Sequence, residues 1–146
     1  MKKLILFIVL NSLIFKILAQ NLEENFIRAV IEKETETWRV KDVKGHTDCW
    51  AIKPYGRILV STEDGKAFDL LPTDMVDVKA EMMGFEGKSV NSNYKISING
   101  TIAWMSYNQV KIAPNGQKNY SYEMRMLEKV KNQWKILGMS VHHYKP

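Results

Sequence analysis

Two Asn-Gly dipeptides in the C-terminal half most constrain how this chain can fold. Asn99-Gly100 and Asn115-Gly116 each stand between two runs in which apolar and polar side chains alternate. Such dipeptides tolerate the backbone angles of tight hairpin turns, and strands joined by tight turns pair antiparallel. The spacing therefore predicts a four-stranded antiparallel meander, with strands at residues 91–98, 101–112, 118–130 and 134–144.

The chain that precedes the meander has helical periodicity. Apolar positions recur at helical spacing over residues 21–45, which predicts a long amphipathic helix. The repeating positions are Ile27, Val30, Ile31, Glu34 and Trp38. A second, short helix is predicted from Thr47, and Pro54 ends it because proline cannot continue a helix.

A hairpin separates the second predicted helix from a third. Asp64-Gly65 is a turn signal between strands predicted at residues 57–62 and 66–71. The third helix is predicted from Pro72 to Gly84. The resulting order predicts an α+β roll, in which three N-terminal helices pack on one face of a curved, mainly antiparallel six-stranded sheet.

The first twenty residues are typical of a secretory signal peptide. Lys2 and Lys3 precede an apolar run from Leu4 to Leu18, which is shorter than the ~20 residues that a membrane-spanning helix needs. We therefore divide the chain into a signal peptide, residues 1–20, and a single domain, residues 21–146. The protein is expected to be exported, to the periplasm or outside a bacterial cell, and an uncleaved N-terminal anchor is the alternative.

The positive charge of the chain comes largely from this N-terminal segment. Its removal takes away three lysines and no acid, so the formal charge falls from +5 to +2. No cluster of lysine and arginine remains in residues 21–146. We therefore expect neither a nucleic-acid partner nor a membrane partner after cleavage.

The metal-ligating residue types are sparse. The one cysteine, Cys49, excludes an internal disulfide and a cysteine-cluster zinc site. His46-x-Asp48 and His142-His143 are the only local clusters, and a strand points the two adjacent histidines to opposite faces. The sequence therefore predicts no metal site and no cofactor.

Short motifs follow one another through the last three strands of the meander. They are Asn99-Gly100-Thr101-Ile102-Ala103-Trp104, Gly116, the run Met124-Arg125-Met126-Leu127-Glu128-Lys129-Val130, and Trp134-Lys135-Ile136. Together with the helix predicted at residues 21–45, their order resembles the NTF2-like superfamily, in particular its SnoaL-like branch of small exported bacterial proteins. The resemblance covers nearly all of residues 21–146.

The resemblance implies a cone-shaped roll with a pocket between helices and sheet, commonly as a homodimer through the outer sheet face. Members of the superfamily include isomerases, dehydratases, cyclases, epoxide hydrolases and non-enzymatic binding or assembly modules. Fold alone therefore does not select a function.

Alternation along the predicted strands sorts side chains into two faces. In the strand at residues 118–130, one face carries tyrosine and methionine and the other carries Glu123 and Arg125. We expect the first face to look toward the helices and the charged face to look outward. Apolar residues on both faces of the last strand, such as Ile136 and Leu137, then indicate a dimer.

The predicted pocket residues share aromatic or thioether side chains, which suit apolar ligands. They are Trp38, Trp50, Tyr55, Trp104, Tyr122, Met124 and Met126. The alternative interpretation is that these side chains only fill the core.

Three functions stay open at this point. We predict a non-catalytic module that binds a small apolar or amphipathic molecule, or a partner, as a homodimer, because no acid–base set is evident. The second is an enzyme of the isomerase, dehydratase or cyclase type that uses Asp48 or His142 as general base, with Asp69, Glu128 and His46 as further candidates. The third is a structural dimer with a filled core.

Overall fold

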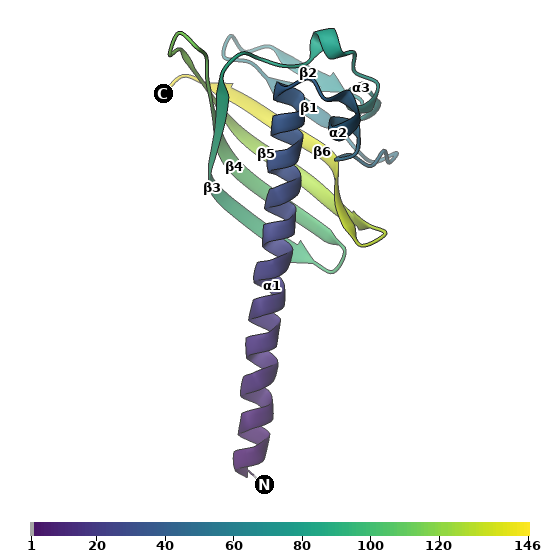
Figure 1. Ribbon diagram of the computed structural model, residues 1–146, viewed down its shortest axis with the longest axis vertical. Coiled ribbons are helices and arrows are strands. Elements are labelled where there is room, and N and C mark those ends of the chain that lie inside the picture. The colour runs from purple at the N-terminus through teal and green to yellow at the C-terminus, as the bar shows by residue number, and fades with distance from the viewer. Residues whose placement is uncertain (1) are drawn as a thin grey trace.

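The computed structural model describes the backbone of residues 2–146 and the side chains of residues 20–146 (Figure 1). The elements are α1 (Lys2–Arg39), α2 (Val43–Thr47), β1 (Ile58–Ser61), β2 (Ala67–Leu70), α3 (Thr73–Val76), the 3₁₀ turn η1 (Ala80–Met82), β3 (Lys88–Asn99), β4 (Ile102–Ile112), β5 (Lys118–Val130) and β6 (Gln133–Tyr144). In the predicted signal peptide, Met1 and the side chains of residues 2–19 lie outside the described part.

The six strands form one mixed sheet in the order β2-β1-β6-β5-β4-β3. From β3 to β6, each strand pairs antiparallel with the next one in the chain, as the Asn-Gly spacing predicts. The hairpin β1–β2 is also antiparallel, and it joins the meander by a parallel pairing of β1 with β6. The predicted α+β class and the mainly antiparallel six-stranded sheet are therefore confirmed.

One long helix accounts for most of the helical cover. α1 crosses one face of the sheet, and the short helices α2 and α3 lie near its C-terminal end (Figure 1). The expected cover of three N-terminal helices is therefore not confirmed in detail, because α2 has five residues and α3 has four. The covered face is called the inner face below, and the opposite one the outer face.

The predicted boundaries of the first two helices are wrong. α1 is continuous from Lys2 to Arg39, so the helix begins well before residue 21. The helix ends before residue 45 because Lys41 adopts a left-handed φ of 63°. Asp42 then caps α2 by accepting a hydrogen bond of 2.9 Å from the Gly45 amide. Asp48 consequently follows α2 instead of lying within it.

The third predicted helix is two short pieces. α3 and η1 are separated by residues 77–79, and the extended backbone of Lys79 (φ −78°, ψ 143°) interrupts the helix there. Gly84, the predicted end of this helix, has a φ of 92°, a left-handed conformation that glycine adopts without strain.

A cluster of fully buried side chains joins α1 to the inner face. Ile27 and Ile31 of α1 pack with Met105 of β4, Leu127 of β5 and Ile136 of β6, all with no exposed surface. The inner face is therefore the one that carries Leu127 and, by alternation, Glu123 and Arg125.

The predicted orientation of the sheet faces is wrong. Glu123 and Arg125 are buried under the helix, whereas Tyr122 and Met126 of the same strand lie exposed on the outer face. Alternation separates the two sets of side chains but does not say which set is covered. The buried charges are tolerated because they pair with one another, a compensation that periodicity does not reveal.

A β-bulge explains the apolar residues on both faces of β6. Leu127 pairs with Ile136 but Met126 pairs with Gly138, so Leu137 is the extra residue. After this residue the alternation is reset, and Met139 and Val141 share the inner face with Ile136. The apolar run in β6 is therefore a consequence of the bulge, and it no longer argues for a dimer.

The packing of α1 predicts a large stability loss when one of its buried side chains is truncated. We expect Ile31→Ala to lower the free energy of unfolding by about 2–5 kcal/mol, because a cavity is left between helix and sheet. The same change at half-exposed Ile52 is the matched control, with an expected cost of about 0.5 kcal/mol. Urea denaturation measures both values, and equal costs would contradict this account of the core.

Candidate functional site

A pocket of about 240 Å³ lies between the C-terminal half of α1 and the inner face. We call it the interior pocket. It is lined by Glu34, Thr35, Trp38, Val60, Met75, Phe85, Ser89, Gln109, Lys111, Glu123, Arg125, Met139, Val141 and His143. Its lining is mixed, with five ionisable side chains next to apolar walls, and so differs from the aromatic and methionine pocket that the sequence suggested.

A buried charge cluster forms one wall of the interior pocket. Arg125 donates from Nη1 to Glu123 Oε2 at 2.9 Å, and both residues are 4 % exposed. Ser121 donates to the other oxygen of Glu123 at 2.5 Å. Arg125 also places its guanidinium carbon 5.6 Å from the ring centroid of Tyr107. The Glu123 carboxylate is therefore well satisfied, as a buried charge must be, whereas Arg125 keeps an Nε–H with no hydrogen-bond partner among residues 20–146.

Glu34 of α1 is a second buried carboxylate at this site, and it is less well satisfied. It is 6 % exposed. Its oxygens lie 3.9 Å from Arg125 Nη2 and 3.9 Å from His46 Nδ1. Both distances are too long for hydrogen bonds. Among the side chains of residues 20–146, none donates a hydrogen bond to this carboxylate, which lines the pocket.

His46 of α2 lies beside this carboxylate, packed between two tryptophans. Its ring has no exposed surface and is 5.1 Å from Trp38 and 6.1 Å from Trp50, measured between ring centroids. Neither ring nitrogen has a hydrogen-bond partner within the described part of the chain. Burial lowers the pKa of His46, and the nearby charge of Glu34 only partly offsets this effect.

Tyr107 completes the buried polar set. Its side chain is 2 % exposed, and its hydroxyl finds no partner among residues 20–146. Burial raises the pKa of Tyr107 well above the ordinary value, so the phenol stays neutral. An arginine, two carboxylates, an imidazole and a phenol are thus buried between the helices and the inner face, with hydrogen-bonding capacity left unused.

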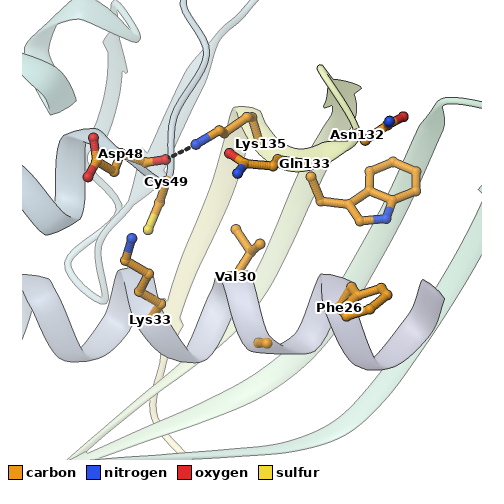
Figure 2. Close-up of a pocket in the computed structure, with 10 residues that line it drawn as sticks. Phe26, Val30, Lys33, Asp48, Cys49, Asn132, Gln133 and Lys135 are labelled. Atoms are coloured by element: carbon orange, nitrogen blue, oxygen red, sulfur yellow. Dashed lines mark hydrogen bonds between the residues drawn. The ribbon is translucent and has the colours of Figure 1, made fainter. Parts of the chain in front are cut away.

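A second hollow of about 420 Å³ lies beside the preceding turns of α1, and Asp48 and Cys49 form part of the wall of this hollow (Figure 2). The Cys49 thiol donates to the Gly45 carbonyl at 3.3 Å, and burial raises its pKa to about 11. The thiol is therefore protonated at neutral pH, which agrees with a structural role for this cysteine.

The two predicted general bases lie outside the interior pocket. The Asp48 side chain is 49 % exposed, and a 3.1 Å bond to Lys44 lowers its pKa. His142 is exposed on the outer face, where its ring nitrogens lie 2.7 Å from Ser61 Oγ and 2.8 Å from Ser140 Oγ. Neither side chain can reach a ligand in the interior pocket.

The structure divides the seven predicted pocket residues into two groups. Trp38 lines the interior pocket, and Trp50 is buried beside His46. The others lie away from it. Tyr55 is exposed and donates to Glu128 Oε2 at 2.9 Å. The remaining four, Trp104, Tyr122, Met124 and Met126, belong to the outer face.

Glu34, Glu123 and Arg125 are not among the site residues predicted from the sequence. One signal for Glu34 was present, because this acid interrupts the apolar stripe of the first helix at a position that must be covered. Glu123 and Arg125 carried no such signal, since charged residues on alternate positions of a strand are typical of a solvated face.

Across residues 20–146, no helix is both long enough and apolar enough to cross a membrane. In the same range, no three histidine, cysteine, aspartate or glutamate side chains gather as a metal site would require.

Comparison with known proteins identifies the fold. No family model matches the sequence, and no curated protein does. An NTF2-like protein of unknown function from Shewanella baltica superimposes with a TM-score of 0.65 at 18% identity, covering 86% of this chain and 96% of that one. The chain therefore has the fold of NTF2-like proteins.

Two other solved structures show how varied the roles of similar proteins are. A proposed scytalone dehydratase from Novosphingobium aromaticivorans matches with a TM-score of 0.62 at 15% identity, over 86% of this chain and 87% of that one. A proposed calcium/calmodulin-dependent protein kinase II association domain from Xanthomonas campestris has a TM-score of 0.59 at 13% identity, over 80% and 84%. The superpositions establish the fold, and at such low sequence identities they leave the activity open.

The burial of His46 predicts that the protein loses stability as the pH falls. Because the folded state holds the pKa of His46 below its ordinary value, the unfolded chain binds the proton first as the pH drops through about 6.5. The free energy of unfolding then decreases by at most about 1.4 kcal/mol per pH unit. Urea denaturation at about pH 7.5 and about pH 5.5 measures this slope.

The change His46→Phe is expected to flatten that slope, since it removes the titrating ring from the core. His142→Phe, on the outer face, is the matched control and should keep the slope of the unchanged protein. A His46→Phe variant with an unaltered slope would show that His46 is not the responsible group.

Proposed function

We propose that this protein is an exported NTF2-like domain that binds a small polar molecule in the interior pocket. The observation that carries the proposal is the buried Glu34 carboxylate, which lines the pocket without a hydrogen bond from the described side chains. Export is supported by the Lys2-Lys3 start and the apolar run after it.

The missing hydrogen-bond donor argues for a ligand, because a buried carboxylate without a donor destabilises the folded protein. The Glu34 side chain is only 8 % exposed, so its carboxylate has lost most of its hydration and keeps contact with the pocket alone. Arg125 Nη2 and His46 Nδ1 each lie 3.9 Å from Glu34, too far to donate a hydrogen bond. The carboxylate therefore remains available to a ligand in the pocket. A ligand N–H or O–H group in the pocket would supply the missing donor.

The size and lining of the pocket favour a compact ligand. Its volume of about 240 Å³ is below the range of about 300–1,000 Å³ of sites for drug-sized molecules. Val60, Met75 and Val141 supply apolar wall, while Ser89 and Gln109 supply hydrogen-bonding groups. The pocket thus suits a small molecule with an apolar body and at least one hydrogen-bond donor.

A second candidate function is proton-transfer catalysis of the isomerase, dehydratase or cyclase type. It is favoured by the neighbouring Glu34 carboxylate and His46 imidazole, two groups that can accept and return protons, and by the likeness to the proposed scytalone dehydratase. In this function Glu34 takes the general-base role for which Asp48 and His142 are badly placed.

A panel of small amines, amides and alcohols tests the binding proposal. Nuclear magnetic resonance titrations should show shifts at Thr35, Ser89 and Gln109, which line the interior pocket. Glu34→Gln should weaken binding by about tenfold or more, because a hydrogen bond to a charged group contributes about 1.5–3 kcal/mol.

Glu36→Gln is the matched control, since Glu36 lies on the same helix and pairs with Arg39 in solvent. Equal binding by the Glu34 and Glu36 variants would overturn the proposal. Glu34-dependent exchange of a bound ketone's α-hydrogens in D₂O would favour the catalytic candidate over simple binding.

We also propose that the outer face is covered by a second copy of the chain. Register places Trp104 directly opposite Met126. Tyr122 stacks on Tyr144 with ring centroids 4.4 Å apart. A continuous exposed patch of this kind is uncommon on a monomer and is typical of an interface. The likeness to an association domain supports the same proposal.

The dimer proposal predicts that a charge on the outer face separates the two copies. Trp104→Glu should weaken dimerization by at least about thirtyfold, or about 2 kcal/mol, because it buries an unpaired charge at an aromatic contact. Leu71→Glu, at an exposed position outside this face, is the control and should leave dimerization unchanged. Sedimentation measures both, and a monomeric parent protein at micromolar concentration would rule the proposal out.

A further inference from the structure

The second hollow, which we call the groove, has a composition unlike that of the interior pocket. Its volume of about 420 Å³ falls within the range of ligand sites. It is lined by Phe26, Ala29, Val30, Lys33, Asp48, Cys49, Asn132, Gln133, Trp134 and Lys135. None of these residues lines the interior pocket, so the groove is a separate site.

The groove has one cationic end and one apolar end. Lys33 and Lys135 lie near Cys49, Phe26 is at the opposite end of the groove, and Val30 lies between the two ends (Figure 2). Trp134 belongs to the apolar end, because its indole N–H donates to Glu23 Oε2 at 2.7 Å, one turn before Phe26. A ligand that spans the groove would therefore meet ammonium groups at one end and aromatic rings at the other.

The two lysines lack carboxylate partners. Lys33 forms no ion pair with any side chain of residues 20–146, and Lys135 donates to the backbone carbonyl of Asp48 instead of its carboxylate. The Asp48 carboxylate is itself engaged by Lys44 at 3.1 Å. The cationic end of the groove thus keeps an excess of positive charge that an anionic group would neutralise.

The apolar end is likewise incompletely covered. Phe26 is 51 % exposed, although it stands next to Val30 and Ala29 in the groove wall. An apolar ligand body along this wall would remove aromatic and aliphatic surface from water, at about 25 cal/mol per Å².

We propose that the groove binds an amphipathic carboxylate, distinct from the ligand of the interior pocket. The carboxylate sits between Lys33 and Lys135, where charge-assisted hydrogen bonds are available. The apolar body extends along Val30 toward Phe26 and Trp134. Fatty acids of medium length and aromatic carboxylic acids have this chemistry.

Titration with octanoate and 1-octanol tests this proposal, because the two probes share an apolar tail and differ in charge. We expect octanoate to bind more tightly than 1-octanol, with amide shifts at Phe26, Asn132 and Gln133. Lys33→Met should weaken octanoate binding by about tenfold and leave 1-octanol binding unchanged, since it removes the charge but keeps an apolar chain of similar length.

Two further variants locate the binding site. Ala29→Phe fills the groove and should abolish the binding of both probes, with its fold checked by circular dichroism. Lys118→Met is the control, because Lys118 is an exposed lysine of β5 that does not line the groove, and this variant should bind octanoate normally.

Glu34→Gln separates this proposal from the one for the interior pocket. Octanoate binding should be unaffected by that change, whatever happens to the ligands of the interior pocket. Equal affinity for the two probes, normal octanoate binding by Lys33→Met, or shifts confined to Thr35, Ser89 and Gln109 would each overturn the inference.

Discussion

The contact between α1 and the inner face is the constraint on which the rest of the structure depends. Ile27 and Ile31 have no exposed surface and share one cluster with side chains of β4, β5 and β6. This contact decides which face of the sheet is covered. It also determines where space remains, because α1 is a straight rod on a curved surface and leaves hollows beside the line of contact.

Successive turns of α1 line the two hollows. Val30 and Lys33 face the groove, and Glu34 and Trp38 face the interior pocket. One amphipathic helix therefore supplies a cation to one site and an anion to the other. The sites have opposite charge requirements, and this is the physical reason for assigning a carboxylate ligand to the groove and a hydrogen-bond donor to the interior pocket.

The buried charges explain why the hydrophobicity of the side chains alone does not predict which residues of this protein are buried. Arg125 and Glu123 are covered because each neutralises the other, and Ser121 completes the hydrogen bonding of the Glu123 carboxylate. Their burial leaves Trp104 and Tyr122 on the outer face, where a second copy of the chain is the proposed cover. The burial of charged side chains and the exposure of aromatic ones thus have the same cause, which is the choice of sheet face that α1 covers.

The sequence could predict the features that depend on neighbouring residues. The Asn99-Gly100 and Asp64-Gly65 turns gave the hairpins, and alternation gave the strands, because turn geometry and strand period are local properties. Helix ends were less predictable: α1 stops at Arg39 because Asp42 begins another helix, so two local signals competed within a few residues.

The amino-acid sequence by itself determined the order of the elements, the antiparallel meander and the resemblance to NTF2-like proteins. Only the tertiary structure decided which sheet face lies under α1, that Leu137 resets the alternation of β6, and that Glu34 meets Arg125 across the pocket. The physical reason is that pairing between charges far apart in the chain determines whether their burial is tolerable, and no local pattern records such pairing.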